Sequence, residues 1–129
     1  LFRSRRAITQ LSDGSIVCSG SDYNLYVWRE GDSESLMRLK GHKSVIRDVA
    51  SFGSSLLSCS DDRTIRIWKK GFHQDHYEST TFFVADSRVT STACERGRDY
   101  IVSGDGDGNI HIFQTDSLME TSSSISDMY

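Results

Sequence analysis

Four oxygen-bearing side chains near the end of the sequence are spaced like the ligands of a calcium-binding loop. Asp105, Asp107 and Asn109 would supply its first three ligands, and Asp116 would supply the acid that closes it. Such a loop also needs a glycine directly after the third ligand, because the backbone turns sharply there. The residue at that place is Ile110. The pattern therefore argues against a calcium site, and the periodicity described below gives these residues another role.

A second group with metal-binding potential lies in the segment GFHQDHY. Its residues His73, Asp75 and His76 could offer nitrogen and oxygen ligands. No cysteine and no further histidine lies near them in the sequence. We therefore interpret the segment as a solvated loop and predict neither a metal site nor a cofactor.

Composition and charge are those of a soluble globular protein. The chain has 129 residues, of which 36% are hydrophobic and 26% charged, enough for one modest domain with its own core. With 15 basic and 18 acidic side chains the net charge is −3, which favours neither a nucleic-acid surface nor a membrane surface. No apolar run approaches the ~18 residues of a membrane-spanning helix, so no membrane insertion is expected.

The cysteines indicate the compartment. There are three, Cys18, Cys59 and Cys94, and none belongs to a C-x-x-C motif. An odd, scattered set favours reduced thiols that pack in strands over a disulfide framework or a zinc site. The opening residues LFRSRR also do not resemble a secretory signal. We therefore expect a cytoplasmic protein, with the nucleus as the alternative.

Aligning the chain on three aromatic residues reveals an internal repeat. Counting back from Trp28, Trp68 and Phe113 gives VCSGSDYNLYVW, LSCSDDRTIRIW and VSGDGDGNIHIF. The aromatics are 40 and 45 residues apart, which is the period of a propeller blade. The sequence therefore predicts three copies of one supersecondary unit.

Each copy carries a turn acid followed by an alternating strand. The acid stands six positions before the aromatic and is Asp22, Asp62 or Asp107. One face of the following strand carries the pairs Leu25/Val27, Ile65/Ile67 and Ile110/Ile112. Alternation of this kind indicates a half-buried β-strand, so we expect this face to be buried in every copy. Asp107 and Asn109 then belong to a hairpin turn.

The middle copy resembles a repeat of a known family. The segment GHKSVIRDVASFGSSLLSCSDDRTIRIW, residues 41–68, is similar to one repeat of the WD40-repeat (WD-repeat) β-propeller family, with its GH start and SxxDxxIxxW-like ending. The resemblance extends over roughly residues 5–115. It implies an all-β fold of three four-stranded blades, at about 5–40, 41–85 and 86–115, within a larger propeller of about seven blades. Residues 116–129 would form a Ser-rich tail or a weak last outer strand.

The expected strands follow from this layout. They are 7–12, 16–21, 25–29 and 35–40, then 45–51, 56–60, 65–69 and 77–84, then 89–94, 100–103 and 110–114, with a weak last strand within 118–125. Three blades would leave two apolar flanks without a neighbour, because repeat proteins bury such faces by stacking. We therefore expect the rest of the propeller to come from a longer parent chain or from oligomerisation.

The resemblance assigns His42, Ser58, Asp62 and Trp68 of the second copy to a hydrogen-bonded structural tetrad. Asp62 would accept from His42, the imidazole would link Asp62 to Ser58, and the Trp68 ring would close the network. The same serine, histidine and aspartate could be taken for a hydrolase triad, but the chain has no G-x-S-x-G nucleophile elbow. We therefore predict no catalytic residue and no enzyme activity in this segment.

The other two copies depart from the pattern. The first has Cys18 in place of the serine and no histidine at its start, and the third has Asp86 in place of the histidine. Their turn acids and blade aromatics are Asp22 and Trp28 in the first copy, and Asp107 and Phe113 in the third. We expect these blades to depend more on packing than on polar closure.

The function implied by the resemblance is that of a non-catalytic interaction scaffold, which recruits a substrate or partner within a multiprotein assembly. In such propellers the loops before the first strand and between the second and third strands gather on one face. Here the candidate partner-binding face comprises Tyr23, Lys43, Ser44, Asp61, Arg63, Ser87, Arg88 and Asp105. The mixture suits protein or peptide partners, with arginine and tyrosine as anchors, and no small-molecule substrate is expected.

Two other functions stay open. The propeller could be the targeting module of an enzyme, such as a ubiquitin ligase component, a kinase or an NTPase, whose catalytic domain lies outside this segment. It could also be a short stand-alone structural protein that closes a ring by oligomerisation. Nucleic-acid binding is a weaker interpretation, because Arg88 and the basic run at residues 3–6 do not make a continuous basic face.

Overall fold

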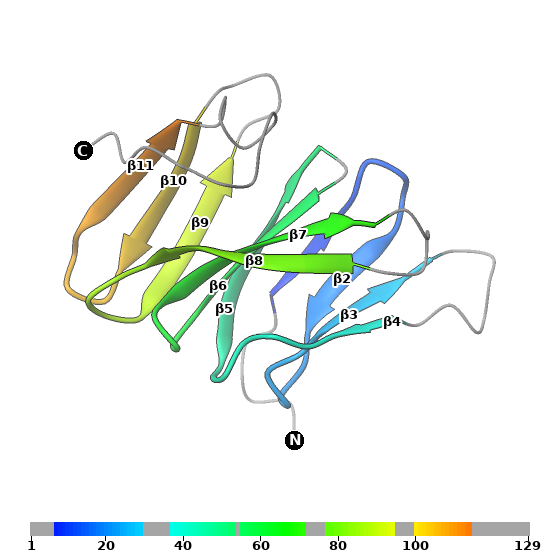
Figure 1. Cartoon of the computed structure of the whole chain (residues 1–129), viewed down its shortest axis with the longest axis horizontal. Coiled ribbons are helices and arrows are strands. Elements are labelled where there is room, and N and C mark those ends of the chain that lie inside the picture. The colour runs from blue at the N-terminus through cyan, green and yellow to red at the C-terminus, as the bar shows by residue number, and fades with distance from the viewer. Residues whose placement is uncertain (1–6, 30–36, 54, 72–76, 95–99, 115–129) are drawn as a thin grey trace.

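The described chain consists of three antiparallel β-sheets that follow one another along the sequence (Figure 1). A computed structural model describes residues 7–29, 37–53, 55–71, 77–94 and 100–114. The sheets contain β1 (Ile8–Gln10), β2 (Ile16–Ser19), β3 (Leu25–Trp28) and β4 (Met37–Leu39), then β5 (Ile46–Phe52), β6 (Ser55–Ser60), β7 (Thr64–Lys70) and β8 (Tyr77–Val84), then β9 (Val89–Cys94), β10 (Tyr100–Asp105) and β11 (Ile110–Gln114). The expected all-β fold is confirmed.

The strand ends agree closely with the sequence pattern. All 11 strands coincide with expected ones, with ends that differ by at most two residues. The weak strand expected within 118–125 lies outside the described residues, and the blade boundaries remain a prediction. Over the described residues, the structure contains no helix that is long and apolar enough to cross a membrane.

One hairpin register recurs in all three sheets. The blade aromatic pairs across the hairpin with Ile16 in the first sheet, Leu56 in the second and Ile101 in the third. Because side chains alternate along a strand, an identical register sends equivalent side chains to the same face of every sheet. Residues 40 or 45 positions apart in the sequence therefore lie at equivalent places on the three sheets.

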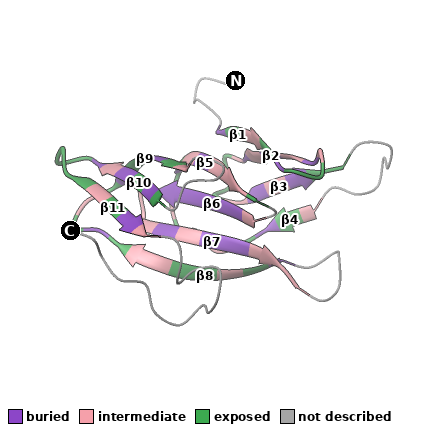
Figure 2. Cartoon of the chain, turned by 90° about the horizontal axis from the view of Figure 1, so that it is seen from above, coloured by how far each residue is buried: buried purple, intermediate pink, exposed green. Residues whose placement is uncertain are grey.

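The sheets pack face to face, and two apolar clusters fill the spaces between them (Figure 2). Between the first and second sheets, Leu25 and Val27 join Leu56 and Trp68. Between the second and third, Ile65 and Ile67 join Ile101 and Phe113, among others. Burying one such side chain contributes about 1.5–3 kcal/mol, so each interface is held mainly by the hydrophobic effect.

Polar contacts also join neighbouring sheets. The Lys70 ammonium group lies 2.7 Å from the Asp13 carboxylate, which links the second sheet to the first. The Thr92 backbone N–H donates to Asp48 over 3.1 Å, and so links the third sheet to the second. These contacts fix the position of one sheet on the next, which apolar packing alone does not do.

The prediction that the strand face is buried in every copy is wrong for the third copy. Ile110 is 71% exposed and Ile112 is 42% exposed, whereas Ile65 and Ile67 are buried. The equivalent faces of the first two sheets are covered by the sheet that follows, and no described element covers this face of the third. We call the face with Val102, Ile110 and Ile112 the trailing flank.

The opposite end of the stack shows the complementary feature. Trp28 is 41% exposed, although Trp68 and Phe113 at equivalent positions are 2% and 1% exposed. Trp68 and Phe113 pack on the sheet that precedes theirs, and no described sheet precedes the first. We call the face with Ile8 and Trp28 the leading flank. The aromatics of the second and third sheets are therefore contacts to the preceding sheet.

Candidate functional site

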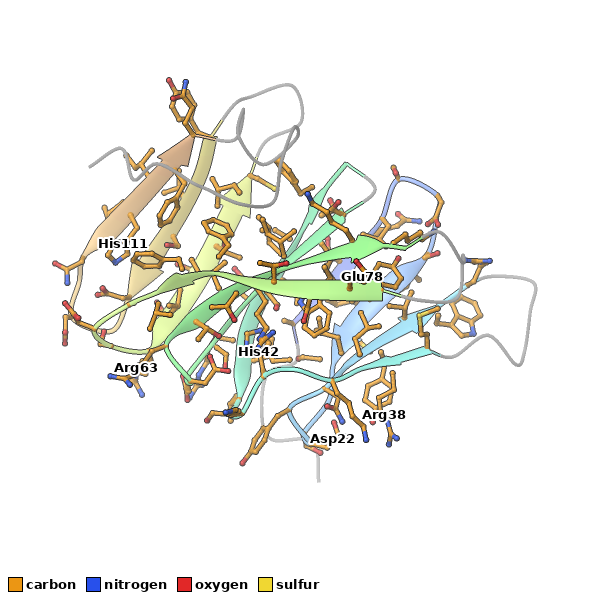
Figure 3. All side chains as sticks on the ribbon, viewed as in Figure 1. Asp22, Arg38, His42, Arg63, Glu78 and His111 are labelled. Atoms are coloured by element: carbon orange, nitrogen blue, oxygen red, sulfur yellow. The ribbon has the colours of Figure 1, made fainter. Side chains whose placement is uncertain are left out.

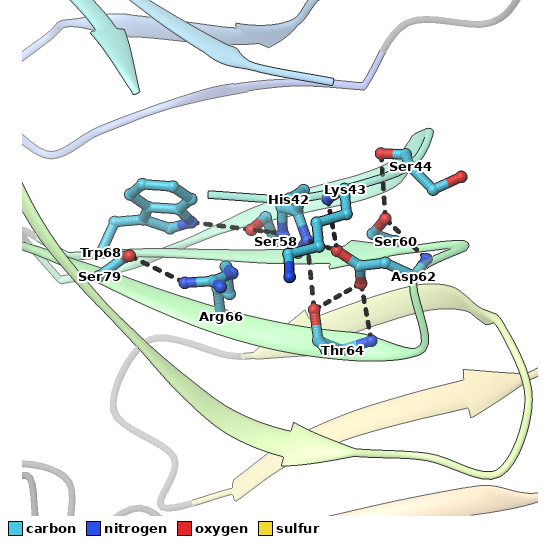
Figure 4. Close-up of polar contacts among 10 residues, drawn as sticks. All are labelled: His42, Lys43, Ser44, Ser58, Ser60, Asp62, Thr64, Arg66, Trp68 and Ser79. Atoms are coloured by element: carbon cyan, nitrogen blue, oxygen red, sulfur yellow. Dashed lines mark hydrogen bonds and ion pairs between the residues drawn. The ribbon is translucent and has the colours of Figure 1, made fainter. Parts of the chain in front are cut away.

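The structure brings His42, Ser58, Asp62 and Trp68 together in the second sheet (Figure 4). His42 Nδ1 lies 2.8 Å from Asp62 Oδ2, and His42 Nε2 lies 2.6 Å from Ser58 Oγ. Trp68 Nε1–H donates to Ser58 Oγ over 2.8 Å. The chain of contacts thus runs from the Trp68 ring, through the middle of the sheet, to the turn that holds Asp62.

One arrangement of protons satisfies the whole network. The Trp68 indole can only donate, so Ser58 Oγ accepts from it and gives its own proton to His42 Nε2. His42 Nδ1–H then donates to the Asp62 carboxylate. Burial lowers the pKa of His42, although the hydrogen bond and charge of Asp62 oppose this, so the imidazole is neutral at pH 7. The network consequently contains a single formal charge, on Asp62.

Asp62 is the polar centre of the β6–β7 turn. Its Oδ1 accepts from Thr64 N over 2.9 Å and from Thr64 Oγ1, and its Oδ2 accepts from Lys43 N over 2.9 Å as well as from His42. Burial would raise the pKa of Asp62, but these hydrogen bonds outweigh it and lower the pKa to about 2. Asp62 therefore holds the start of the sheet and the hairpin turn in one geometry.

The network does not have the properties of a catalytic triad. Ser58 is completely buried, and its oxygen already contacts both the Trp68 ring and the imidazole. A nucleophilic serine needs an open approach for a substrate carbonyl, and this one has none. Among the described residues, no group of three or more His, Cys, Asp or Glu side chains is placed to hold a metal ion. His73, Asp75, His76 and Asp116 lie outside the described residues.

In the first sheet the turn acid occupies the equivalent position, but its side chain is exposed. Asp22 accepts from the backbone and side chain of Asn24 and from the Tyr26 hydroxyl. The Tyr26 hydrogen bond is the main reason why the pKa of Asp22 is lowered. Cys18 stands where Ser58 stands in the second sheet, on the exposed leading side, and its thiol is free. The other free thiols, Cys59 and Cys94, lie in β6 and β9.

In the third sheet the interpretation of Asp107 as the working turn acid is wrong. Its side chain is exposed and receives no hydrogen bond from a described residue, whereas its backbone N–H donates to Asp105 Oδ1 over 2.9 Å. Asp105 also accepts from Asn109 N, from the Asn109 side chain and from His111 Nε2 at 2.9 Å. The polar centre of the third turn therefore lies two positions earlier than in the second. Asp105 occupies the repeat position of Ser60, and its longer side chain reaches the donors of the turn.

These hydrogen bonds change the pKa of the Asp105 carboxyl group. The hydrogen bond from His111, followed by those of Asn109 and the Asp107 backbone, lowers the pKa of Asp105 to about 2 against the opposing effect of burial. Sequence reasoning missed His111 and, in the second sheet, the part played by Thr64. A usable signal existed: the residue two positions before the aromatic is Tyr26 in the first copy and His111 in the third, and both can donate to a turn carboxylate.

The candidate partner-binding face lies along one edge of the stack, at the β2–β3, β6–β7 and β10–β11 turns and the loops beside them (Figure 1). Backbone hydrogen bonds tie the segments of the second and third sheets together: Asp61 N donates to Val45 O, Ala85 N to Arg63 O, and Gly106 N to Arg88 O. We call this edge, comprising residues 20–24, 41–45, 61–63, 85–88 and 105–109, the turn edge.

The eight predicted face residues fall into two groups on the turn edge. Tyr23, Lys43, Arg63 and Arg88 are exposed. The other four are partly or fully buried. For Asp61, Ser87 and Asp105, whose side chains are engaged or shielded, the expectation of a free contact surface is wrong. Asp105 is 7% exposed, and Asp61 is held by Arg47 in a two-point ion pair at 2.8 and 2.7 Å. The Ser87 hydroxyl is buried, and Ser44 uses its carbonyl to accept from Ser60 Oγ.

Comparisons with known proteins agree with this geometry. Residues 33–69 match the family model described as WD domain, G-beta repeat. The chain is similar to the Denticleless protein homolog of Danio rerio, with 39% identity over 62 residues, 44% of this chain and 10% of that protein. It is also 31% identical over 115 residues to ubiquitin homeostasis protein lub1 of Schizosaccharomyces pombe, covering 88% of this chain and 15% of lub1.

A third relative is the serine/threonine-protein kinase VPS15 of Arabidopsis thaliana, which is 31% identical over 85 residues, 62% of this chain and 6% of the kinase. The chain thus spans only 6% to 15% of the length of these three relatives. With the matched repeat, the 40- and 45-residue periods and three stacked antiparallel sheets, this chain belongs to the WD40-repeat family of β-propeller proteins.

Proposed function

We propose that this chain is a propeller segment that acts as a non-catalytic interaction scaffold and recruits a protein or peptide partner at the turn edge. The observation that carries the proposal is the exposure of Tyr23, Lys43, Arg63 and Arg88 on turns and loops that are held in place by backbone hydrogen bonds. Side chains presented from a rigid frame lose little conformational freedom of the backbone when a partner binds. Arginine and tyrosine are also the residue types that carry much binding energy at protein interfaces.

A site-specific photo-crosslinking experiment tests this function. A photoreactive amino acid replaces Tyr23 in one variant and Glu78, an exposed residue of β8 away from the turn edge, in a control (Figure 3). The variants are irradiated in an extract of cells that express the protein. We expect discrete crosslinked species from position 23 and none of them from position 78. Equal patterns from both positions, or none from position 23, would refute the assignment of the partner site.

We further propose that the leading and trailing flanks pack against additional blades. The leading flank presents Trp28, as the second sheet presents Trp68 to the first, and the trailing flank presents Ile110 and Ile112, as the second presents Ile65 and Ile67 to the third. Each flank is thus one half of an interface that the chain already makes twice. Light scattering of the 129-residue chain tests where the missing halves come from.

The light-scattering result separates two accounts. A folded monomer or a self-adhering, poorly ordered chain is expected if the other blades belong to a longer parent protein. A stable closed oligomer would instead support a short structural protein that completes its own ring. Either way, we propose that the protein works in the cytoplasm or the nucleus.

A second candidate function is a targeting module for an enzyme. The specific observation that favours it is that one relative is named a serine/threonine-protein kinase and that this chain matches only 6% of its length. Under this function the catalytic domain lies elsewhere in the parent protein, and the propeller only positions it. Sequencing the complete transcript tests this, since a parent chain with no catalytic or nucleotide-binding domain would exclude it.

A further inference from the structure

The exposed members of the predicted partner-binding face are mostly basic. Of the eight predicted face residues, the four exposed ones are a tyrosine and three cations, Tyr23, Lys43, Arg63 and Arg88. No hydrogen bond or ion pair from a described residue engages the side chains of Lys43, Arg63 or Tyr23. These groups are therefore free to contact another molecule.

The acids of the β6–β7 turn, by contrast, already have hydrogen-bond partners. Both oxygens of Asp61 accept from the Arg47 guanidinium. Both oxygens of Asp62 accept from protein donors, two of which are backbone N–H groups. Three exposed acids lie elsewhere on the turn edge: Asp22 in the β2–β3 turn, where it accepts from Asn24 and Tyr26, Asp86 in the loop of Arg88, and Asp107 in the β10–β11 turn. Within the β6–β7 turn and the loop before β5, the acids therefore have partners, whereas the exposed cations Lys43 and Arg63 remain available.

The cations converge on that turn from three segments. Lys43 donates its backbone N–H to Asp62, which places the residue directly beside the turn. Arg63 lies in the turn itself, and its carbonyl accepts from Ala85 at the start of the loop that carries Arg88. Arg88 is also close enough for its charge to contribute to the lowered pKa of Asp61, after the larger effect of Arg47. Three basic residues thus surround one hairpin turn.

The turn backbone does not need the side chain of Arg63. Tyr23, Arg63 and Gly108 stand at equivalent positions, with φ angles of 69°, 74° and 87°. This left-handed conformation is unfavourable for residues with a Cβ, and the third turn uses the glycine that the geometry prefers. The first two turns instead carry large side chains at a backbone cost of about 1–2 kcal/mol each. Such a cost at an exposed position points to a role outside the fold.

We propose that the β6–β7 turn, with Arg63 at its tip and Lys43 and Arg88 beside it, binds an acidic segment of a partner protein. Tyr23 on the neighbouring blade would pack against the same segment. This inference rests on the proposed function and adds the chemistry of the partner. Carboxylates and the phosphate groups of modified side chains would both be recognised by these cations, and arginine can hold either one through two parallel hydrogen bonds.

Fluorescence anisotropy with defined peptides tests the inference. The probes are a labelled glutamate oligomer of about ten residues, a phosphoserine-containing peptide of equal length, and a glutamine oligomer as the neutral control. We expect both acidic peptides to bind more tightly than the glutamine oligomer, and the binding to weaken as salt concentration rises. Binding of the phosphoserine peptide alone would identify phosphate as the required group.

Matched variants make the site assignment specific. Arg63→Gly and Lys43→Gln should each weaken acidic-peptide binding by about 2- to 5-fold, the usual range for an exposed charge pair. Arg38→Gln removes an exposed arginine from β4, well apart from Arg63 in Figure 3, and should leave binding unchanged. Because glycine relieves the left-handed strain, Arg63→Gly should keep its melting temperature, which separates lost binding from lost folding.

Two results would overturn the inference. One is equal affinity of the wild-type chain for the glutamate, phosphoserine and glutamine peptides. The other is an equal loss of affinity in Arg38→Gln and Arg63→Gly. If crosslinks from position 23 persist in either case, the turn edge still binds a partner, and only the acidic character of that partner is refuted.

Discussion

Replacing Asp62 by asparagine tests the polar centre of the second blade with the smallest change of shape. All four groups that contact the carboxylate are donors: Thr64 N and Oγ1 on Oδ1, His42 Nδ1 and Lys43 N on Oδ2. An asparagine amide has one accepting atom and one donating atom. With its NH₂ group toward His42 and Lys43, the amide faces two N–H donors and loses two hydrogen bonds. Turned the other way it loses the bond from Thr64 N, while the Thr64 hydroxyl can accept instead of donate.

The expected cost follows from the hydrogen bonds lost. A typical hydrogen bond contributes about 1 kcal/mol net, and a buried donor left unpaired costs about 1–3 kcal/mol. The Asp62 side chain is 11% exposed and His42 has none of its side chain exposed, so water can compensate Lys43 N more easily than the imidazole. We therefore expect Asp62→Asn to reduce the free energy of unfolding by about 1–3 kcal/mol, or the melting temperature by roughly 4 °C per kcal/mol.

Asp107→Asn is the matched control. It makes the same chemical change at the equivalent repeat position, where the side chain is exposed and receives no hydrogen bond from a described residue. Its effect should stay within about 0.5 kcal/mol. Urea unfolding followed by tryptophan fluorescence compares the two variants. Equal destabilisation of both, or no loss in Asp62→Asn, would refute the view that donors surround Asp62 on every side.

Three further predictions concern the same framework. Trp68→Ala should destabilise the chain by about 3–5 kcal/mol and Trp28→Ala by less than about 1 kcal/mol, because only Trp68 is buried. Similar losses of both variants in thermal melts would contradict the assignment of Trp28 to the exposed leading flank. Burial lowers the pKa of His42 in the folded state below the ordinary histidine value of 6.5, so the unfolded state binds more protons and stability should fall as pH drops below 6.5. His42→Ala should cost about 1–3 kcal/mol at pH 7 and flatten this slope, and a slope equal to wild type would argue against a neutral buried imidazole. Asp105→Asn should destabilise the third blade more than Asp107→Asn, since only Asp105 carries hydrogen bonds, and the reverse order in urea melts would contradict the relocated polar centre.

Much of the local structure could be predicted because it depends on short-range pattern. Period-two alternation and turn residues locate a strand without knowledge of its neighbours, which is why the ends of β7 and β11 were expected to within two residues. The grouping of His42, Ser58, Asp62 and Trp68 was open to prediction only through the family resemblance. Nothing in the spacing of a histidine and an aspartate 20 residues apart requires their side chains to meet.

The functional surface was harder to predict, because a loop position says little about whether its side chain is free. Asp61 and Arg63 are two residues apart, yet Arg47 engages the first and the left-handed backbone presents the second to solvent. Asp105 and Asp107 offered the same carboxylate at the same turn. Their roles were separated by which carboxylate His111 and Asn109 could reach.

The repeat, the strands and the single aromatic of each copy could all be predicted from patterns along the chain. These properties are set by contacts between residues close along the chain, and alternation carries them directly. Only the tertiary structure decided which of the equivalent surfaces are buried. Trp68 and Trp28 occupy the same repeat position, but burial depends on whether another sheet lies against the face, and only Trp68 has one among the described residues.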